Sequence, residues 1–177
     1  MKFQLLAASA ALVFAFAGAA EAHGPTRQKT SRSIEISASP DKVWKVVGDF
    51  QDGSWIPVVE KTEGQGGNDK DATRTLTLKD GATVKETLTK YDAEKMTFAY
   101  RITEVDVKVL PVTNYSSHIT VTGEGDKATV TWNGAFYRGY PNNDPPAELN
   151  DAAAIKAVDD LYDASLKSLK DKVEKGS

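Results

Sequence analysis

The sequence predicts an α+β fold in which a curved antiparallel sheet of about six to seven strands wraps around one long C-terminal helix. Apolar residues alternate with polar ones in several short segments up to Phe136, as expected for strands with one buried face. Near the C-terminus the spacing becomes helical, with apolar residues every three or four positions as far as Val173. Because such a helix must bury its apolar stripe, we expect it to pack on the sheet.

The first 22 residues predict an export signal. Lys2 precedes an apolar run over residues 5–17, and Ala20 and Ala22 provide small residues at a cleavage site. The run is shorter than the ~20 apolar residues that span a bilayer. We therefore expect cleavage of residues 1–22, a mature chain beginning near His23, a periplasmic location and no membrane attachment afterwards.

Composition indicates a single domain and argues against several functions. Roughly 155 residues remain after cleavage, which suits one domain over residues 32–177 behind a flexible arm at residues 23–31. The absence of cysteine excludes disulfides and thiolate chemistry. A net charge of −3 without a Lys/Arg cluster argues against nucleic acid. Two distant histidines argue against a zinc site, and we expect no metal and no cofactor, because no cofactor motif is present.

The first elements are a strand and a short helix. Residues 32–37 alternate and predict a strand. Ser39 as N-cap and Pro40 at the first helical position then predict a helix that ends at Gly48. A second strand is expected from Val58, after a turn at residues 55–57 that closes one end of the core.

A hairpin follows, with strands around Leu76 and Leu88 and a turn at Asp80 and Gly81. A two-residue loop would set the apolar faces of the two strands out of phase. We therefore predict an odd-numbered loop with Gly81 at positive φ, which pairs Leu78 with Val84 and Leu76 with Glu86.

Three further strands and the long helix complete the chain. Alternation over residues 96–102, 115–121 and 130–136 predicts the strands, with a hairpin turn at residues 123–126. A turn-rich loop follows at residues 139–146. We expect Asp144 to cap the helix, with the prolines after it in the first turn.

This order of elements resembles the helix-grip superfamily of START, pollen-allergen and polyketide-cyclase proteins, also called SRPBCC. Local motifs agree with it over almost the whole chain after residue 22. They are Ser-Pro-Asp-Lys-Val-Trp at residues 39–44, Asp49-Phe50, Arg74-x-Leu76-x-Leu78-x-Asp80-Gly81 and Glu86-x-Leu88. The resemblance implies a helix-grip fold with a cavity between sheet and helix.

A narrower resemblance links three segments to the MxaD-type accessory proteins of methylotrophic bacteria. The segments are residues 23–26, 110–117 and 134–146. The resemblance implies a periplasmic, non-enzymatic accessory role in methanol oxidation, with methanol dehydrogenase, its cytochrome c acceptor, or both as partners. Two alternatives stay open, because one scaffold hosts many functions. They are a carrier or sensor of a small apolar ligand, and a cyclase or lyase-like enzyme using Glu86 with Tyr100.

Two charged residues stand out on faces that are otherwise apolar, Arg74 and Glu86. They indicate a polar anchor for a ligand carboxylate or carbonyl, a structural ion pair, or an end of the sheet that is open to water. Aromatic residues on similar faces suit either a ligand cavity or a packed core. The cavity candidates are Trp55, Arg74, Glu86, Phe98, Tyr100, Tyr115, Trp132 and Phe136.

The loop before the long helix is the best candidate for a partner surface, because Tyr and Arg are favoured at interface centres. Its candidate residues are Tyr137, Arg138, Tyr140, Asn142, Asn143 and Asp144, with the arm at residues 23–31 as a second candidate. His118 is expected to point outward, out of phase with its apolar neighbours, and is weak evidence for catalysis without a second catalytic group.

Overall fold

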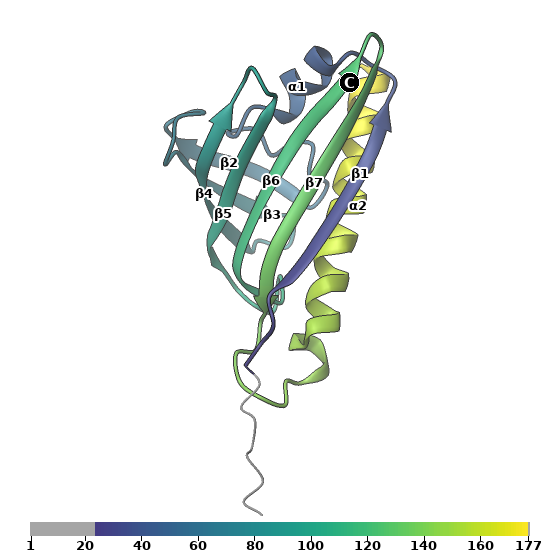
Figure 1. The fold of residues 1–177 in the computed structure, drawn as a ribbon. Coiled ribbons are helices and arrows are strands. Elements are labelled where there is room, and N and C mark those ends of the chain that lie inside the picture. Colours follow the sequence, from purple (N-terminus) through teal and green to yellow (C-terminus); the bar gives the residue numbers. More distant parts are fainter. Residues whose placement is uncertain (1–23, 177) are drawn as a thin grey trace, which may run out of the picture.

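The computed structural model describes residues 24–176, so the predicted export signal lies outside the described residues. A seven-stranded antiparallel sheet, in the order β1-β7-β6-β5-β4-β3-β2, curves around the long helix α2 (Figure 1). The elements are β1 (Gln28–Ile36), α1 (Pro40–Val47), β2 (Val59–Gln65), β3 (Thr73–Leu78), β4 (Thr83–Asp92), β5 (Thr97–Val105), β6 (Val112–Glu124), β7 (Lys127–Arg138), η1 (Ala147–Leu149) and α2 (Asp151–Lys175). The predicted α+β helix-grip fold is confirmed.

Strand β1 begins earlier than the apolar alternation indicated. It starts at Gln28 and pairs with β7 from Gln28 opposite Phe136 to Ile36 opposite Ala128. Residues 28–31, which were expected to belong to the flexible arm, therefore lie in the sheet. Backbone hydrogen bonds to a long neighbouring strand hold this polar segment in place, and such bonds leave no trace in the hydropathy pattern.

Helix α1 forms as its end signals predicted. Ser39 accepts a hydrogen bond from the backbone N–H of Lys42 at 3.3 Å, and Pro40 occupies the first helical position. The helix ends at Gly48, whose N–H donates a hydrogen bond to the carbonyl oxygen of Trp44 at 2.7 Å. The helix buries Val43 and Val47 against the core.

The hairpin between β3 and β4 has the predicted odd-numbered loop but not the predicted register. Gly81 has a φ of +86°, and the N–H of Leu78 donates to the carbonyl of Ala82 at 2.8 Å, so the loop is tight. Leu76 pairs with Val84, so the expected pairings of Leu78 with Val84 and of Leu76 with Glu86 were both wrong. A slip of two residues keeps every side chain on its face, so the apolar pattern could not distinguish the two registers. As a result, Arg74 lies directly opposite Glu86.

The start of α2 also differs from the prediction. Asp144 does not cap the helix and the prolines do not lie in its first turn, because the short 3-10 helix η1 intervenes. The N-cap is Asn150, whose side-chain oxygen accepts a hydrogen bond from the N–H of Ala153 at 2.8 Å. Asn and Asp cap equally well, so composition did not indicate which residue does so.

Replacing Asn150 by alanine should lower the free energy of unfolding by about 1 kcal/mol, because the first turn of α2 loses its capping acceptor. Asp144→Gly is the matched control. Its φ of +53° suits glycine, and its effect should stay within about 0.5 kcal/mol. Urea denaturation of both variants measures the difference, and an equal loss in the two would contradict the assignment of the cap.

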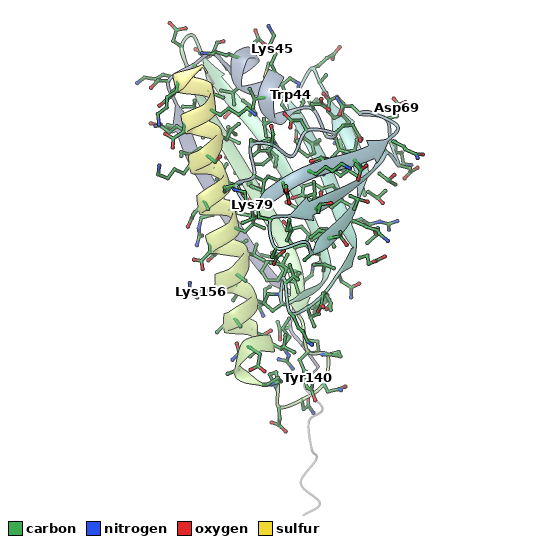
Figure 2. All side chains as sticks on the ribbon, turned by 180° about the vertical axis from the view of Figure 1, so that it is seen from behind. Trp44, Lys45, Asp69, Lys79, Tyr140 and Lys156 are labelled. Carbon is green, nitrogen blue, oxygen red and sulfur yellow. The ribbon has the colours of Figure 1, made fainter. Side chains whose placement is uncertain are left out.

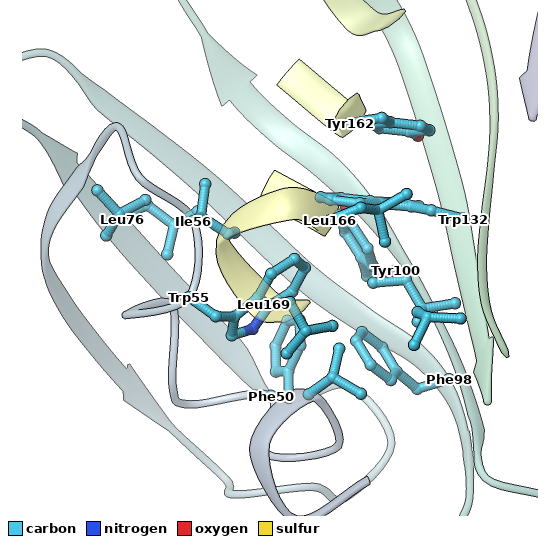
Figure 3. Close-up of a cluster of buried hydrophobic side chains, with 14 of the residues drawn as sticks. Phe50, Trp55, Ile56, Leu76, Phe98, Tyr100, Trp132, Tyr162, Leu166 and Leu169 are labelled. Atoms are coloured by element: carbon cyan, nitrogen blue, oxygen red, sulfur yellow. The ribbon is translucent and has the colours of Figure 1, made fainter. Parts of the chain in front are cut away.

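The core lies between the inner face of the sheet and the apolar stripe of α2. The stripe buries Val158, Tyr162, Leu166, Leu169 and Val173. Figure 3 shows Leu166 and Leu169 of α2 among the aromatic side chains that the sheet and the α1–β2 connection contribute. No helix in the described part of the chain is long and apolar enough to cross a membrane.

Candidate functional site

A cavity of about 610 Å³ lies between α2 and the sheet. This volume falls within the range of small-molecule sites. Most of the lining is apolar. The exposed lining residues include Lys79 and Asp80 of the β3–β4 turn, Lys108 of the β5–β6 loop and Asp160 of α2, so the mouth of the cavity lies between these two loops and the helix. Figure 2 shows Lys79 beside the middle of α2 at this opening.

The structure brings four of the eight predicted cavity residues to the lining. They are Glu86, Tyr100, Tyr115 and Trp132. The other four, Trp55, Arg74, Phe98 and Phe136, are buried and do not line the cavity. Strand alternation predicted that each of these side chains points inward. Whether a side chain reaches the cavity or stays in the core depends on how α2 and the loops cover the inner face of the sheet.

Several lining residues were not predicted from the sequence. They come from the mouth loops and from α2, and include Pro57, Val58, Val109, Ala157, Leu161 and Ala164. The sequence of α2 did contain a signal for its lining residues. Ala157 and Ala164 lie one turn before and after Leu161, and small residues beside an apolar stripe leave space for a cavity. The loop residues carried no such signal.

Arg74 and Glu86 form a buried ion pair, of which Glu86 lines the cavity. The Nε of Arg74 donates to Oε2 of Glu86 at 2.6 Å, and the two side chains are 2% and 5% exposed. The Nη1 of Arg74 donates to the carbonyl of Phe50 at 2.7 Å. The guanidinium carbon also lies 4.4 Å from the ring centroid of Phe50 and 5.5 Å from that of Tyr100. The pair thus holds Arg74 in a fixed position.

A hydroxyl network crosses from the sheet to α2 beside the cavity. The hydroxyls of Tyr115 and Tyr162 lie 2.5 Å apart, and Ser117 lies 3.1 Å from Tyr162 and accepts from Nε1 of Trp132 at 2.6 Å. Gly134 makes room for this network, because a Cβ there would collide with the Tyr162 hydroxyl. These bonds satisfy the polar atoms of large side chains that the helix buries.

Burial dominates the electrostatics of the site. Burial raises the pKa of the Glu86 carboxyl, and the Arg74 guanidinium opposes that rise. Burial and the nearby Glu86 charge raise the pKa of the Tyr100 hydroxyl. Burial and the neighbouring phenols likewise raise the pKa of Tyr115 well above its usual value. The two tyrosines are therefore protonated near neutral pH.

The predicted partner loop contains one residue that is not on the surface. Arg138 is only 8% exposed, because it donates to the carbonyls of Tyr140 at 2.8 Å and Asn142 at 2.9 Å and to Asp151 at 3.2 Å. The expectation that Arg138 offers a contact surface was wrong, and its physical role is to fix the loop. Asn142, Asn143 and Asp144 are exposed, and Tyr137 and Tyr140 are half-buried.

Three chain segments meet at this end of the molecule, as Figure 1 shows for the start of β1 and the loop after β7. The N–H of Gly139 donates to the carbonyl of Pro111 at 2.7 Å, which joins the loop to the start of β6. Arg27 donates to Ser116 at 3.0 Å and lies 5.6 Å from the ring centroid of Tyr137. The chain before β1, residues 110–117 and residues 134–146 therefore form one composite surface, here called the end surface.

His118 is exposed on the outer face of β6, as predicted, and lies 3.1 Å from the side-chain nitrogen of Asn133. Among residues 24–176, no group of three or more His, Asp or Glu side chains could hold a metal ion.

The curved sheet, the long helix held against it and the cavity between them define a helix-grip protein. Residues 27–174 match the family described as polyketide cyclase / dehydrase and lipid transport, and the chain belongs to this family. No curated protein sequence matches the chain.

Solved structures agree with this assignment. The protein XoxI from Bacillus cereus is 30% identical over 82% of this chain and 94% of its own, with a TM-score of 0.68. An uncharacterised protein from Bacillus thuringiensis is 29% identical over 82% and 98%, with a TM-score of 0.69. The ZhuI aromatase/cyclase from Streptomyces sp. R1128 is 17% identical over 85% and 95%, with a TM-score of 0.69, and shares the fold.

Proposed function

We propose that this chain is a periplasmic, non-enzymatic accessory protein of methanol oxidation. It promotes the productive interaction of methanol dehydrogenase with its cytochrome c acceptor, and the end surface is where it docks. The proposal starts from the resemblance of residues 23–26, 110–117 and 134–146 to MxaD-type proteins. The observation that carries it is that two of these segments, residues 110–117 and 134–146, come together at one end of the fold. Arg27, which follows the first segment, joins them through its hydrogen bond to Ser116.

The end surface has the physical properties of a docking site. Its loop is stiffened from inside by the three hydrogen bonds of Arg138. A loop ordered before binding loses little conformational entropy on docking. Two tyrosines, Tyr137 and Tyr140, lie half-exposed beside three exposed polar residues, which suits an interface with an aromatic centre and a polar rim.

Adding charge to the end surface should weaken the protein's stimulation of methanol oxidation. Asn142→Lys/Asn143→Lys introduces two long cations that an interface would have to desolvate, so the variant should lose at least tenfold in partner affinity. The measurement is methanol-dependent reduction of the cytochrome c by methanol dehydrogenase, followed as the accessory protein is titrated.

Thr122→Lys/Thr129→Lys is the matched control. It adds the same two charges to a directly opposed pair near the β6–β7 hairpin, at the other end of the sheet. The control should stimulate electron transfer as the unmodified protein does. The docking assignment is overturned if both variants behave alike, and the accessory role itself fails if the unmodified protein has no effect on the rate.

The cavity favours a second candidate function, a carrier or sensor of a small apolar ligand. Its volume of about 610 Å³ and its largely apolar lining suit such a ligand. A cyclase or lyase would need a group that exchanges protons with its substrate. Glu86 and Tyr100 are the candidates for such a group, and Oε2 of Glu86 is already occupied by its hydrogen bond from Arg74.

A further inference from the structure

Glu86 provides the cavity with a hydrogen-bond acceptor. One of the alternatives left open for Arg74 and Glu86 was a polar anchor for a ligand carboxylate or carbonyl, but Arg74 does not line the cavity. Two of its nitrogens donate to Glu86 and to the carbonyl of Phe50, and its guanidinium lies over two aromatic rings. Glu86 is the residue of the pair that faces the cavity.

One oxygen of Glu86 has no donor. Oε2 accepts the hydrogen bond from Arg74 at 2.6 Å, and among residues 24–176 no side chain or backbone N–H donates to Oε1. Oε1 is not among the fully enclosed side-chain atoms that lack a hydrogen-bond partner, so it opens onto the cavity. A ligand in this largely apolar cavity would gain a hydrogen bond by bringing a donor to this oxygen.

We propose that the cavity binds a neutral, ring-sized apolar molecule that donates one hydrogen bond, a phenol or an alcohol, and that Glu86 accepts it. This inference rests on the second candidate function, binding of a small apolar ligand. The rings of Tyr100, Tyr115 and Trp132 line the cavity around the acceptor and offer aromatic faces for the apolar part of the ligand.

The charges of Glu86 and Arg74 favour a neutral ligand that donates a hydrogen bond over a charged ligand. An anionic ligand would place its charge beside the carboxylate of Glu86, and like charges in a buried site repel strongly. A cationic amine would leave two cations facing one carboxylate, because Arg74 already neutralises Glu86. The charged side chains at the mouth are two lysines and two aspartates, so the mouth favours neither sign.

Three probes of one shape test the inference by calorimetric titration of the purified protein. They are 2-naphthol, which donates a hydrogen bond, 2-methoxynaphthalene, which cannot, and the anion 2-naphthoate. We expect 2-naphthol to bind at least about tenfold more tightly than its methyl ether, as a hydrogen bond to a charged acceptor provides. The naphthoate should bind most weakly.

Two variants connect the selectivity to Glu86. Arg74→Met/Glu86→Leu replaces the whole pair and should bind the naphthol and its ether with equal affinity. Lys85→Met/Glu104→Leu removes an exposed ion pair from the outer face of the same sheet and should keep the preference. Leu161→Trp places a large ring at the cavity lining and should weaken all three probes at least tenfold.

The outcomes separate the inference from the function on which it rests. Equal affinity for the naphthol and its ether in the unmodified protein would show apolar binding without an acceptor and overturn the inference alone. Tightest binding of the naphthoate would show that the cavity favours an anion and overturn the inference as well. If no probe binds, the inference fails together with the carrier or sensor function.

Discussion

Replacing Arg74 by methionine should lower the free energy of unfolding by about 3–5 kcal/mol, among the largest single effects expected in this protein. The change leaves Glu86 buried without its partner, at 5% side-chain exposure and with a pKa that burial already raises. It also removes the hydrogen bond to the carbonyl of Phe50. Urea denaturation followed by tryptophan fluorescence measures the loss.

The double variant Arg74→Met/Glu86→Leu should recover most of this stability, because no unpaired charge remains and both new side chains are apolar. The exposed ion pair between Lys85 of β4 and Glu104 of β5 provides the control. Lys85 lies 2.8 Å from Glu104, with side-chain exposures of 48% and 66%, and Lys85→Met should change stability by under about 1 kcal/mol. A small effect of Arg74→Met would mean that water reaches the pair.

Trp132→Ala should lower the free energy of unfolding by about 3–5 kcal/mol, as expected for truncation of a large aromatic residue in a core. Trp132 is 1% exposed and stacks on Tyr162 of α2, with ring centroids 4.1 Å apart and planes inclined by 11°. It also contacts Trp55 at a centroid distance of 5.2 Å and donates to Ser117 at 2.6 Å. The change therefore removes a contact that holds α2 to the sheet.

Denaturation can still be followed in this variant, because Trp44 and Trp55 remain. Trp132→Phe keeps a ring against Tyr162 and should lose clearly less than the alanine variant. Val58→Ala, at a position 44% exposed, should change stability by no more than about 0.5 kcal/mol. Equal losses for alanine and phenylalanine at position 132 would assign the effect to the hydrogen bond with Ser117 instead of the stack.

The sequence was sufficient for the fold because the patterns that specify its elements are local. Alternation on β6 and β7 identified their inward residues, and the spacing from Val158 to Val173 identified the face of α2. Ser39 and Pro40 likewise marked the start of α1 through interactions within one turn. Each of these signals depends on neighbours a few residues away.

Predictions were wrong where a distant contact decided the structure. The slip of two residues in the β3–β4 hairpin, the start of β1 at Gln28 and the N-cap at Asn150 all preserve the hydropathy pattern. Arg138 could not be distinguished from a surface arginine, because its acceptors come from the folded path of the following loop and from Asp151. None of these partners follows from the spacing of residue types.

What the sequence by itself determined is the α+β fold, the inward faces of the strands and the presence of two charges, Arg74 and Glu86, on such a face. Only the tertiary structure decided that these charges pair directly, that Glu86 and not Arg74 faces the cavity, and that residues 110–117 and 134–146 meet at one end. The physical reason is that side-chain periodicity assigns a residue to a face of its element, whereas strand register and the packing of loops and α2 set its depth and its neighbours.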